Sequence, residues 1–185
     1  RDASGRDTGS SAGTGHEAPG SILVLLDSHE SQAERRLIVS GIGSALDEQS
    51  MNNPLETVII HGGTSLDVDE QVKELLQHSK DKIDAIICTN VVQTQSVSQL
   101  TVDLNSVGNF SIIGTYQNQA ILEALAKGVI FSSILVDASR MGSEAVRSLA
   151  EYLHYGYTSD YVAIESSILT PADAADLLRR QSETE

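Results

Sequence analysis

The residues best suited to chemistry are polar side chains that directly follow apolar runs of the sequence. Histidine, asparagine, threonine and tyrosine can exchange hydrogen bonds with a ligand, and histidine can also act as a base or bind a metal ion. These groups could bind a ligand, perform catalysis or only cap the helices that follow them. They are Ser28, His29 and Glu30, then residues 61–64, then Thr89 and Asn90, and finally Thr115, Tyr116 and Gln117.

The spacing of these residues does not favour catalysis. No short His/Cys/Asp spacing typical of zinc occurs, and no glycine-rich phosphate or dinucleotide loop follows an apolar run, so we expect neither a metal nor a cofactor. Cys88, the single cysteine, lies inside an apolar run, where a thiol usually packs as a small hydrophobic group. A G-x-S-x-G match at residues 9–13 lacks the strand and helix of a nucleophile elbow. The sequence therefore predicts no enzyme.

The elements that would position these groups are buried strands that alternate with amphipathic helices. The run SILVLLD at residues 21–27 is typical of a strand covered on both faces. This alternation predicts an α/β fold with a doubly wound parallel sheet in three layers (α/β/α) and right-handed crossovers. Ligands of such sheets gather beyond the carboxyl ends of the strands, where the polar groups fall. The expected strands are 21–27, 57–63, 84–90, 110–114, 129–137 and 161–169, and the expected helices are 31–48, one from Asp67, 93–105, 118–127, 139–155 and one from Pro171.

Composition limits the partners of the chain. It has 12 Lys and Arg against 26 Asp and Glu, a formal net charge of −14. That field repels phosphate backbones and anionic lipid surfaces, so we expect no nucleic-acid binding by this chain. No apolar run approaches the roughly 20 residues that a membrane helix needs, so we expect no membrane insertion.

The chain divides into three parts by composition. Residues 1–20 contain little to bury and predict a flexible tail or linker. Residues 21–170 carry the alternating elements and predict one α/β domain. Residues 171–185 predict a C-terminal helix, with Pro171 at its first position, and a tail.

Taken in order, these segments resemble the second half of type I periplasmic sugar-binding proteins and the related effector domains of LacI-type repressors. The similarity runs from about Ser21 to Thr170 and is most specific in IIGTYQNQAILEALAKGVIFSSILVDASRMGSEAVRSLAEYLHYG. The family shows there a strand ending in Gly-Phe-Asp, a helix closed by Lys-Gly, and a strand leading to a Gly-Ala-x-x-Ala-Val helix. DAIICTN stands where the family has a strand ending in Asn-Asp, and ILTPAD resembles its closing strand.

The resemblance also implies site residues. Arg36 stands where the family places an arginine that binds sugar hydroxyls, with Arg35 as its competitor and a solvated helix charge as the alternative. Asn90 matches a hinge-side asparagine. Tyr116 replaces a sugar-gripping aspartate and Val136 replaces a polar hinge residue, which implies a flatter or less hydroxylated ligand stacked on Tyr116, or no ligand. The candidate ligand contacts are Arg36, Asn90, Tyr116, Gln117, Ser28, His29 and Asp137.

The resemblance covers one lobe of a family whose members have two. In the family, the helix that matches residues 139–156 crosses to pack on the first lobe, yet only a Gly-rich segment precedes Ser21. We therefore expect a fragment of a longer protein. The apolar stripe of this helix would be covered by the missing N-terminal lobe or by a second copy, unless the helix folds back onto its own sheet.

The function implied by the resemblance is binding of a small molecule, a sugar or a sugar-like compound. The chain would be a solute-binding module of an ABC transporter or an extracellular sensor, located outside the cell or in the periplasm. A cytoplasmic effector domain of a LacI-type regulator is the first alternative, and an enzyme on a similar sheet is the second, because fold alone does not establish chemistry.

Overall fold

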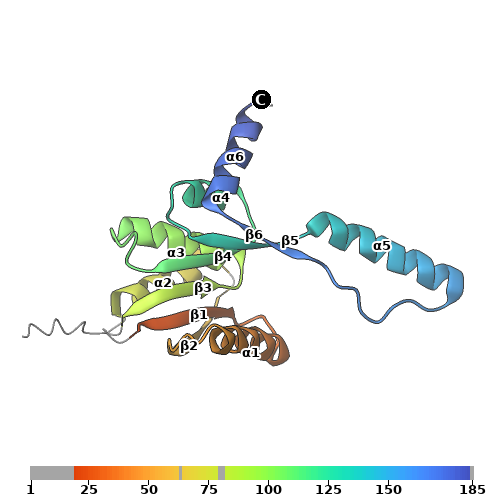
Figure 1. Ribbon diagram of the computed structural model, residues 1–185, viewed down its shortest axis with the longest axis horizontal. Coiled ribbons are helices and arrows are strands. Elements are labelled where there is room, and N and C mark those ends of the chain that lie inside the picture. Colours follow the sequence, from red (N-terminus) through yellow and green to blue (C-terminus); the bar gives the residue numbers. More distant parts are fainter. Residues whose placement is uncertain (1–18, 63, 79–81, 184–185) are drawn as a thin grey trace, which may run out of the picture.

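A computed structural model describes residues 19–62, 64–78 and 82–183 of the chain. The expected tail at residues 1–20 and the G-x-S-x-G match lie almost wholly outside the described residues. Six strands form one sheet in the order β2-β1-β3-β4-β5-β6 (Figure 1). The elements in chain order are β1 Ser21–Asp27, α1 Gln32–Glu48, β2 Leu55–Ile60, α2 Ser65–His78, β3 Ile83–Cys88, α3 Val91–Asp103, β4 Ser111–Thr115, α4 Gln119–Ala126, β5 Ser132–Val136, α5 Ala138–Tyr155, β6 Ser166–Leu169 and α6 Pro171–Ser182.

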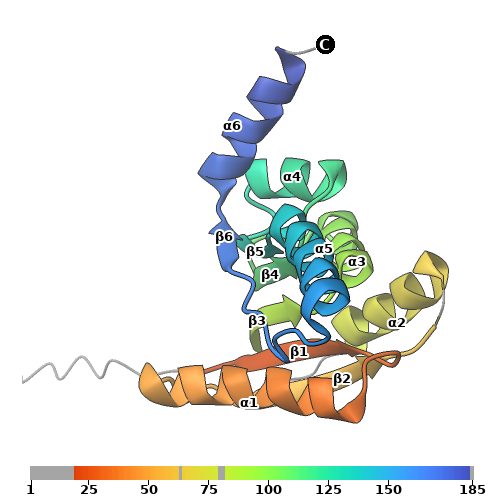
Figure 2. The same cartoon turned by 90° about the vertical axis from the view of Figure 1, so that its right-hand side faces the viewer.

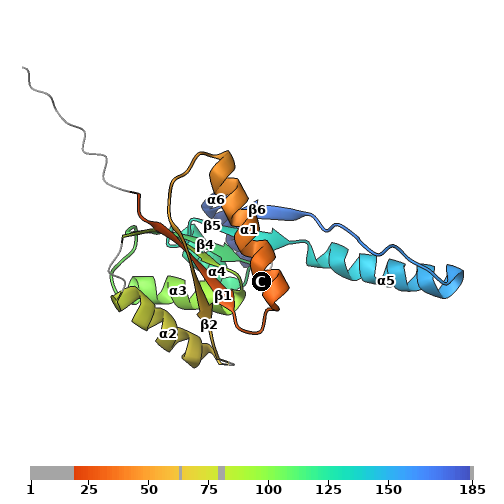
Figure 3. The same cartoon turned by 90° about the horizontal axis from the view of Figure 1, so that it is seen from below.

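The helices lie on both sides of the sheet, which confirms the doubly wound α/β prediction. α1 lies on one side, next to β1 and β2, whereas α2 and α3 lie on the other (Figure 3). The main core forms between the sheet and this second group of helices, where Leu25 and Ile86 of the sheet are fully buried with Val72 of α2 and Val97 of α3. Continuous apolar strands are expected wherever helices cover both faces.

The sixth strand differs from the prediction of a wholly parallel sheet. β1 to β5 pair in parallel, but β6 pairs with β5 in the antiparallel direction, Val136 opposite Ser166. It is also shorter than the predicted strand at 161–169. The physical reason is that the chain leaves β5 into α5 and returns to the same end of the sheet, where the Asp137 amide donates to the Glu165 carbonyl at 3.4 Å. A strand that starts at that end has to run antiparallel to β5.

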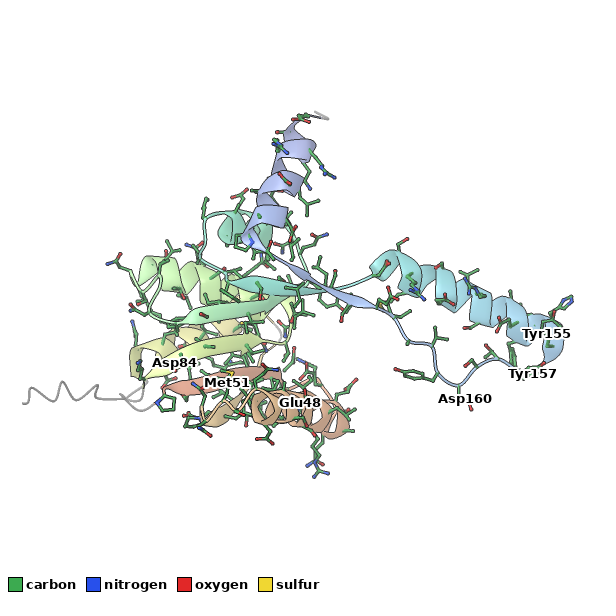
Figure 4. The ribbon with its side chains drawn as sticks, in the orientation of Figure 1. Glu48, Met51, Asp84, Tyr155, Tyr157 and Asp160 are labelled. Carbon is green, nitrogen blue, oxygen red and sulfur yellow. The ribbon has the colours of Figure 1, made fainter. Side chains whose placement is uncertain are left out.

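α5 and the returning segment 156–165 form an arm that projects from the end of β5 and β6 (Figure 1). No residue of α5 is buried. Figure 4 labels Tyr155, Tyr157 and Asp160 at the far end of the arm, away from the sheet.

Gly114 of β4 marks the closest approach between the sheet and α3. A Cβ atom at this position would lie 2.5 Å from the Cγ2 atom of Thr94, which is fully buried. The Thr94 hydroxyl ties the two elements together, because it accepts from the Thr115 amide at 3.2 Å and donates to the Asn90 carbonyl at 2.8 Å.

We predict that Gly114→Ala lowers the free energy of unfolding by about 1–3 kcal/mol, the usual cost of overpacking a core. Urea denaturation would measure this loss, and adding Thr94→Ser, which deletes the clashing methyl group, would recover part of it. The control is Gly41→Ala on α1, where nothing lies within 4 Å of the new Cβ. That control is expected to stabilise by about 0.4–1 kcal/mol, since alanine restricts the unfolded chain. Equal losses in the two single variants would contradict the packing argument.

Candidate ligand-binding site

The carboxyl end of β1 is organised by the Asp27 carboxylate. Its Oδ1 atom accepts from both the backbone amide and the Nδ1 atom of His29, each at 2.8 Å. Its Oδ2 atom accepts from the Nδ2 atom of Asn90 at 2.9 Å. The carboxylate therefore joins the end of β1 to the residue that follows β3, the strand beside it in the sheet.

Asn90 has two roles at once. It is the N-cap of α3, and its Oδ1 atom accepts from the Gln93 amide at 2.9 Å. Its Nδ2 atom binds Asp27, so both ends of the Asn90 side-chain amide are engaged. An asparagine is favoured at such a position because its carbonyl satisfies a free helical amide. The N-terminus of α3 is thereby fixed against the end of β1.

The loop between β1 and α1 is held by Arg35. Its Nη1 atom donates to the backbone carbonyls of Glu30 at 2.8 Å and of Asp27 at 3.2 Å. Ser31 and Glu34 form a capping box at the start of α1. These bonds fix the backbone on which His29 stands, while the His29 side chain remains 72% exposed.

The hydrogen bonds at Asp27 also set its protonation. Burial alone would raise the pKa of the Asp27 carboxyl, but the bonds from His29 and Asn90 and the attraction of the imidazole outweigh burial, so this pKa lies below its ordinary value. Asp27 is thus a carboxylate at neutral pH.

Tyr116 follows β4 in a left-handed backbone conformation, with φ of 63°. For a residue with a side chain this conformation costs energy unless the surroundings enforce it. Both polar groups of its backbone are held by β5, since its amide donates to the Ile134 carbonyl at 2.7 Å and its carbonyl accepts from the Ser133 hydroxyl at 2.5 Å. The residue is 40% exposed.

Asp27, His29, Asn90 and Tyr116 line one hollow of about 390 Å³ at the carboxyl ends of the strands. Its lining is largely apolar and completed by Ile60, Gly62, Thr64, Ser65, Val68, Val91, Val92 and Gln93. Gln93 is 1% exposed, and its Nε2 atom is one of two buried side-chain polar atoms without a hydrogen-bond partner among the described residues. We refer to this feature as the site hollow.

The structure brings together three of the residues predicted from the sequence, His29, Asn90 and Tyr116. Arg36 does not line the site hollow but a shallower one on the α1 side of the sheet, with Leu26 and Ile59. Asp137 is the N-cap of α5 at the base of the arm. Ser28 and Gln117 border the lining residues in sequence without lining the hollow themselves. Binding by any of these residues stays a prediction.

Sequence reasoning missed Asp27 and Gln93 as parts of the site. Asp27 ends the first apolar run, and a charged residue at that place was a usable signal. Gln93 lies in the first turn of α3, and nothing in the sequence distinguishes it from a solvent-facing glutamine. Among the described residues, no group of three or more His, Cys, Asp or Glu side chains could hold a metal ion. No helix in the described part of the chain is long and apolar enough to span a bilayer.

The chain matches a family model described as a periplasmic binding protein domain over residues 2–157. No curated protein sequence matches it significantly.

Solved structures of sugar-binding proteins share its fold. A glucose-galactose binding protein, GanP from Geobacillus stearothermophilus, is 20% identical with a TM-score of 0.68, and the match covers 84% of this chain and 54% of GanP. A carbohydrate transporter solute binding protein from Agrobacterium radiobacter, in complex with D-arabinose, is 17% identical with a TM-score of 0.71, covering 88% and 55%. An ABC transporter solute binding protein from Agrobacterium vitis with bound D-fucose is 18% identical with a TM-score of 0.64, covering 82% and 51%. The chain thus spans about half the length of the structures it matches.

The Asp27 carboxylate gives a prediction for pH dependence. Its pKa is lower in the folded than in the unfolded chain, so its stabilising effect is complete above the unfolded pKa and is lost as the pH falls through the folded pKa. We expect Asp27→Asn to lower the free energy of unfolding at neutral pH and to flatten its decline between about pH 5 and pH 2. Urea denaturation across this range would measure the slope. Asp47→Asn, at an exposed position of α1, is the control. An unchanged slope in the Asp27 variant would contradict the proposed bonding.

Proposed function

This chain belongs to the periplasmic binding protein domain family, and from that membership we propose that it forms one lobe of a solute-binding protein for a small carbohydrate. Its fold is that of the solute-binding proteins of ABC transporters. The observation that supports the proposal best is the site hollow, in which Asp27, His29, Asn90 and Tyr116 meet at the carboxyl ends of the strands. This is the edge at which open α/β sheets bind ligands. On this proposal the lobe binds and releases its ligand without covalent chemistry and acts outside the cell or in the periplasm, as a transport component or a sensor.

The proposed ligand is a ring-shaped sugar with few hydroxyl groups. Most polar atoms of the site hollow are already engaged: both carboxylate oxygens of Asp27 and both amide atoms of Asn90 bind protein groups, and the Thr64 hydroxyl donates to Asp67 at 2.8 Å. Each additional hydroxyl group of the ligand would lose its hydrogen bonds to water and find few protein groups to replace them. A buried polar group without a partner costs about 1–3 kcal/mol.

The groups that remain available suggest how the sugar would be held. The Nε2 atom of His29 has no bond among the described residues, since Nδ1 is directed to Asp27. Nδ1 donates to the Asp27 carboxylate, which leaves Nε2 to exchange a hydrogen bond with a ligand hydroxyl. The Tyr116 ring offers an apolar face for the carbon side of the sugar ring. Gln93, which also lines the site hollow, adds its Nε2 atom as a donor.

A second lobe is part of the proposal. The site hollow is open, and the chain spans about half of the structures it matches. Closure of another lobe over the bound sugar would exclude water and complete the contacts. This lobe could be a preceding segment of the protein or a second copy of the chain.

We predict that D-fucose binds more tightly than D-galactose, which differs by one additional hydroxyl group. The expected ratio is about tenfold, because one unpaired hydroxyl costs about 1–3 kcal/mol. Ligand-observed NMR suits the measurement, because it detects the weak binding expected of a single lobe. Equal affinities would refute the argument from engaged polar atoms, and no binding by any monosaccharide would refute the proposed function itself.

The role of Tyr116 can be separated from its effect on folding. Tyr116→Gly removes the ring and also relieves the left-handed backbone, so we expect sugar binding to be lost without any decrease in the melting temperature. Tyr161→Gly is the matched control, since that ring is 80% exposed on the returning segment of the arm. Sugar binding that survives in Tyr116→Gly would show that the ring is not a contact.

A further inference from the structure

The first turn of α3 offers the site hollow hydrogen-bond donors without partners. α3 lies between α2 and α4 on one side of the sheet (Figure 2). It begins at Val91, shortly after β3 ends, so its N-terminus lies at the carboxyl edge of the sheet, and Val91, Val92 and Gln93 all line the site hollow. The Asn90 side chain accepts from the amide of Gln93. Among the described residues, no group accepts from the amides of Val91 and Val92, which are two of the amides that a helix leaves unpaired at its start.

The Gln93 side chain supplies a third donor at the same end of the helix. Its Oε1 atom accepts from the Thr89 amide at 3.0 Å, so the side chain turns back toward the start of α3. This bond fixes which end of the side-chain amide is the oxygen, because a backbone amide can only donate. The nitrogen, Nε2, has no acceptor among the described residues, although Gln93 is only 1% exposed. A buried donor of this kind favours a ligand that brings an oxygen to it.

The side-chain acceptors beside α3 are, in contrast, mostly engaged. The carboxylate oxygens of Asp27 accept from His29 and Asn90, and the side-chain oxygen of Asn90 accepts from the third amide of α3. The Thr64 hydroxyl accepts from the Asp67 amide at 3.3 Å and donates to the Asp67 carboxylate. A ligand oxygen that carries a hydrogen atom therefore finds few acceptors, whereas an oxygen without a hydrogen atom meets free donors at α3.

The charge beside α3 separates neutral ligand oxygens from anionic ones. A helix N-terminus carries roughly half a unit of positive charge, which by itself attracts anions. Asp27 carries a full negative charge and is bonded to Asn90, the N-cap residue of α3, at 2.9 Å. At comparable distances the full charge outweighs the half charge, so the local field does not favour an anion. The net charge of the whole chain, −14, acts in the same direction.

We propose that the ligand directs a neutral carbonyl oxygen to the first turn of α3, where the amides of Val91 and Val92 and the Nε2 atom of Gln93 donate to it. The chemical class is a sugar with one oxidised but uncharged carbon, as in a sugar lactone or the ester of a sugar acid. A hydroxyl group is disfavoured because its hydrogen finds no acceptor, whereas a carbonyl oxygen only accepts. This selection rests on the proposed carbohydrate-binding function and acts among the sugars that this function allows. Gln93 is then a residue that determines specificity.

The test compares sugars that differ in one group. D-fucose, D-galactose and the methyl ester of D-galacturonic acid differ at C6, and D-galactono-1,4-lactone carries its carbonyl at C1 instead. Ligand-observed NMR is expected to show about tenfold tighter binding of the ester or of the lactone than of D-galactose, the gain from one hydrogen bond to an otherwise unpaired buried donor. D-galacturonate, which is charged, is expected to bind more weakly than its ester.

Two variants remove donors of α3. Gln93→Met keeps the length of the side chain and deletes Nε2, and Val91→Pro deletes the first amide at a helix position where proline is favoured. Asn90 already has the extended backbone that a following proline requires, with φ of −145° and ψ of 170°. Gln93→Met is expected to lower the ratio of ester to D-fucose affinity about tenfold, and Val91→Pro to lower it as well. Because Gln93→Met also removes the acceptor of the Thr89 amide, this ratio is the readout: a loss of structure would weaken both sugars alike. Gln95→Met, the same change at a position outside the site hollow, is the matched control and is expected to keep the ratio.

The other outcomes separate this inference from the function on which it rests. Binding of D-fucose without a preference for either carbonyl compound would overturn the inference and leave the proposed function standing. Absence of binding by every sugar would refute both. Tighter binding of D-galacturonate than of its ester would overturn the choice of a neutral group. A preference for the ester that survives in Gln93→Met and in Val91→Pro would show that α3 does not bind the carbonyl oxygen.

Discussion

The Asp27 carboxylate is the interaction on which the candidate site depends. It is bonded to His29 beyond its own strand and to Asn90 beyond the next strand, and Asn90 in turn starts α3. Without this carboxylate, the ends of β1 and β3 would share only the ladder, and the His29 ring would lose the bond that orients it. This single carboxylate thus orients the His29 imidazole and holds Asn90, the N-cap residue of α3, on one side of the site hollow. The same hydrogen bonds lower the pKa of the Asp27 carboxyl group.

The opposite wall of the site hollow depends on β5 rather than on β1. Tyr116 keeps a left-handed backbone because Ser133 and Ile134 hold its carbonyl and its amide. Gly114, two residues earlier, lets α3 approach so closely that Thr94 can bond the amide of Thr115. The tyrosine ring is therefore presented by a backbone that is fixed from both neighbours, α3 and β5. Such preorganisation reduces the entropy that a ligand has to offset on binding.

The pattern of the sequence predicted the elements well, because buried strands and amphipathic helices leave strong periodic signals. It located the ends of the strands, and hence His29, Asn90 and Tyr116, because parallel strands bring their carboxyl ends to one edge. It did not predict the direction of β6, which follows from the path of the arm and not from the residues of the strand. The likeness to sugar-binding proteins pointed to Arg36, yet the structure places this side chain at the hollow beside Leu26.

The same residues that shape the site also connect it to the arm. Ser133 holds the carbonyl of Tyr116 on one side, and on the other β5 pairs with β6, Ser133 opposite Leu169. The β5–β6 ladder ends at Asp137 and Glu165, where Arg140 fixes the first turn of α5. The backbone of Tyr116 is hydrogen-bonded to β5, so a ligand that moves Tyr116 has to strain or break these hydrogen bonds. β5 is also one of the two strands from which the arm projects. The Tyr116 backbone and the base of the arm are therefore both held by β5. Whatever covers α5 is attached to the strand that holds Tyr116, so a lobe docked on the arm would be positioned relative to the site hollow by this two-stranded ladder.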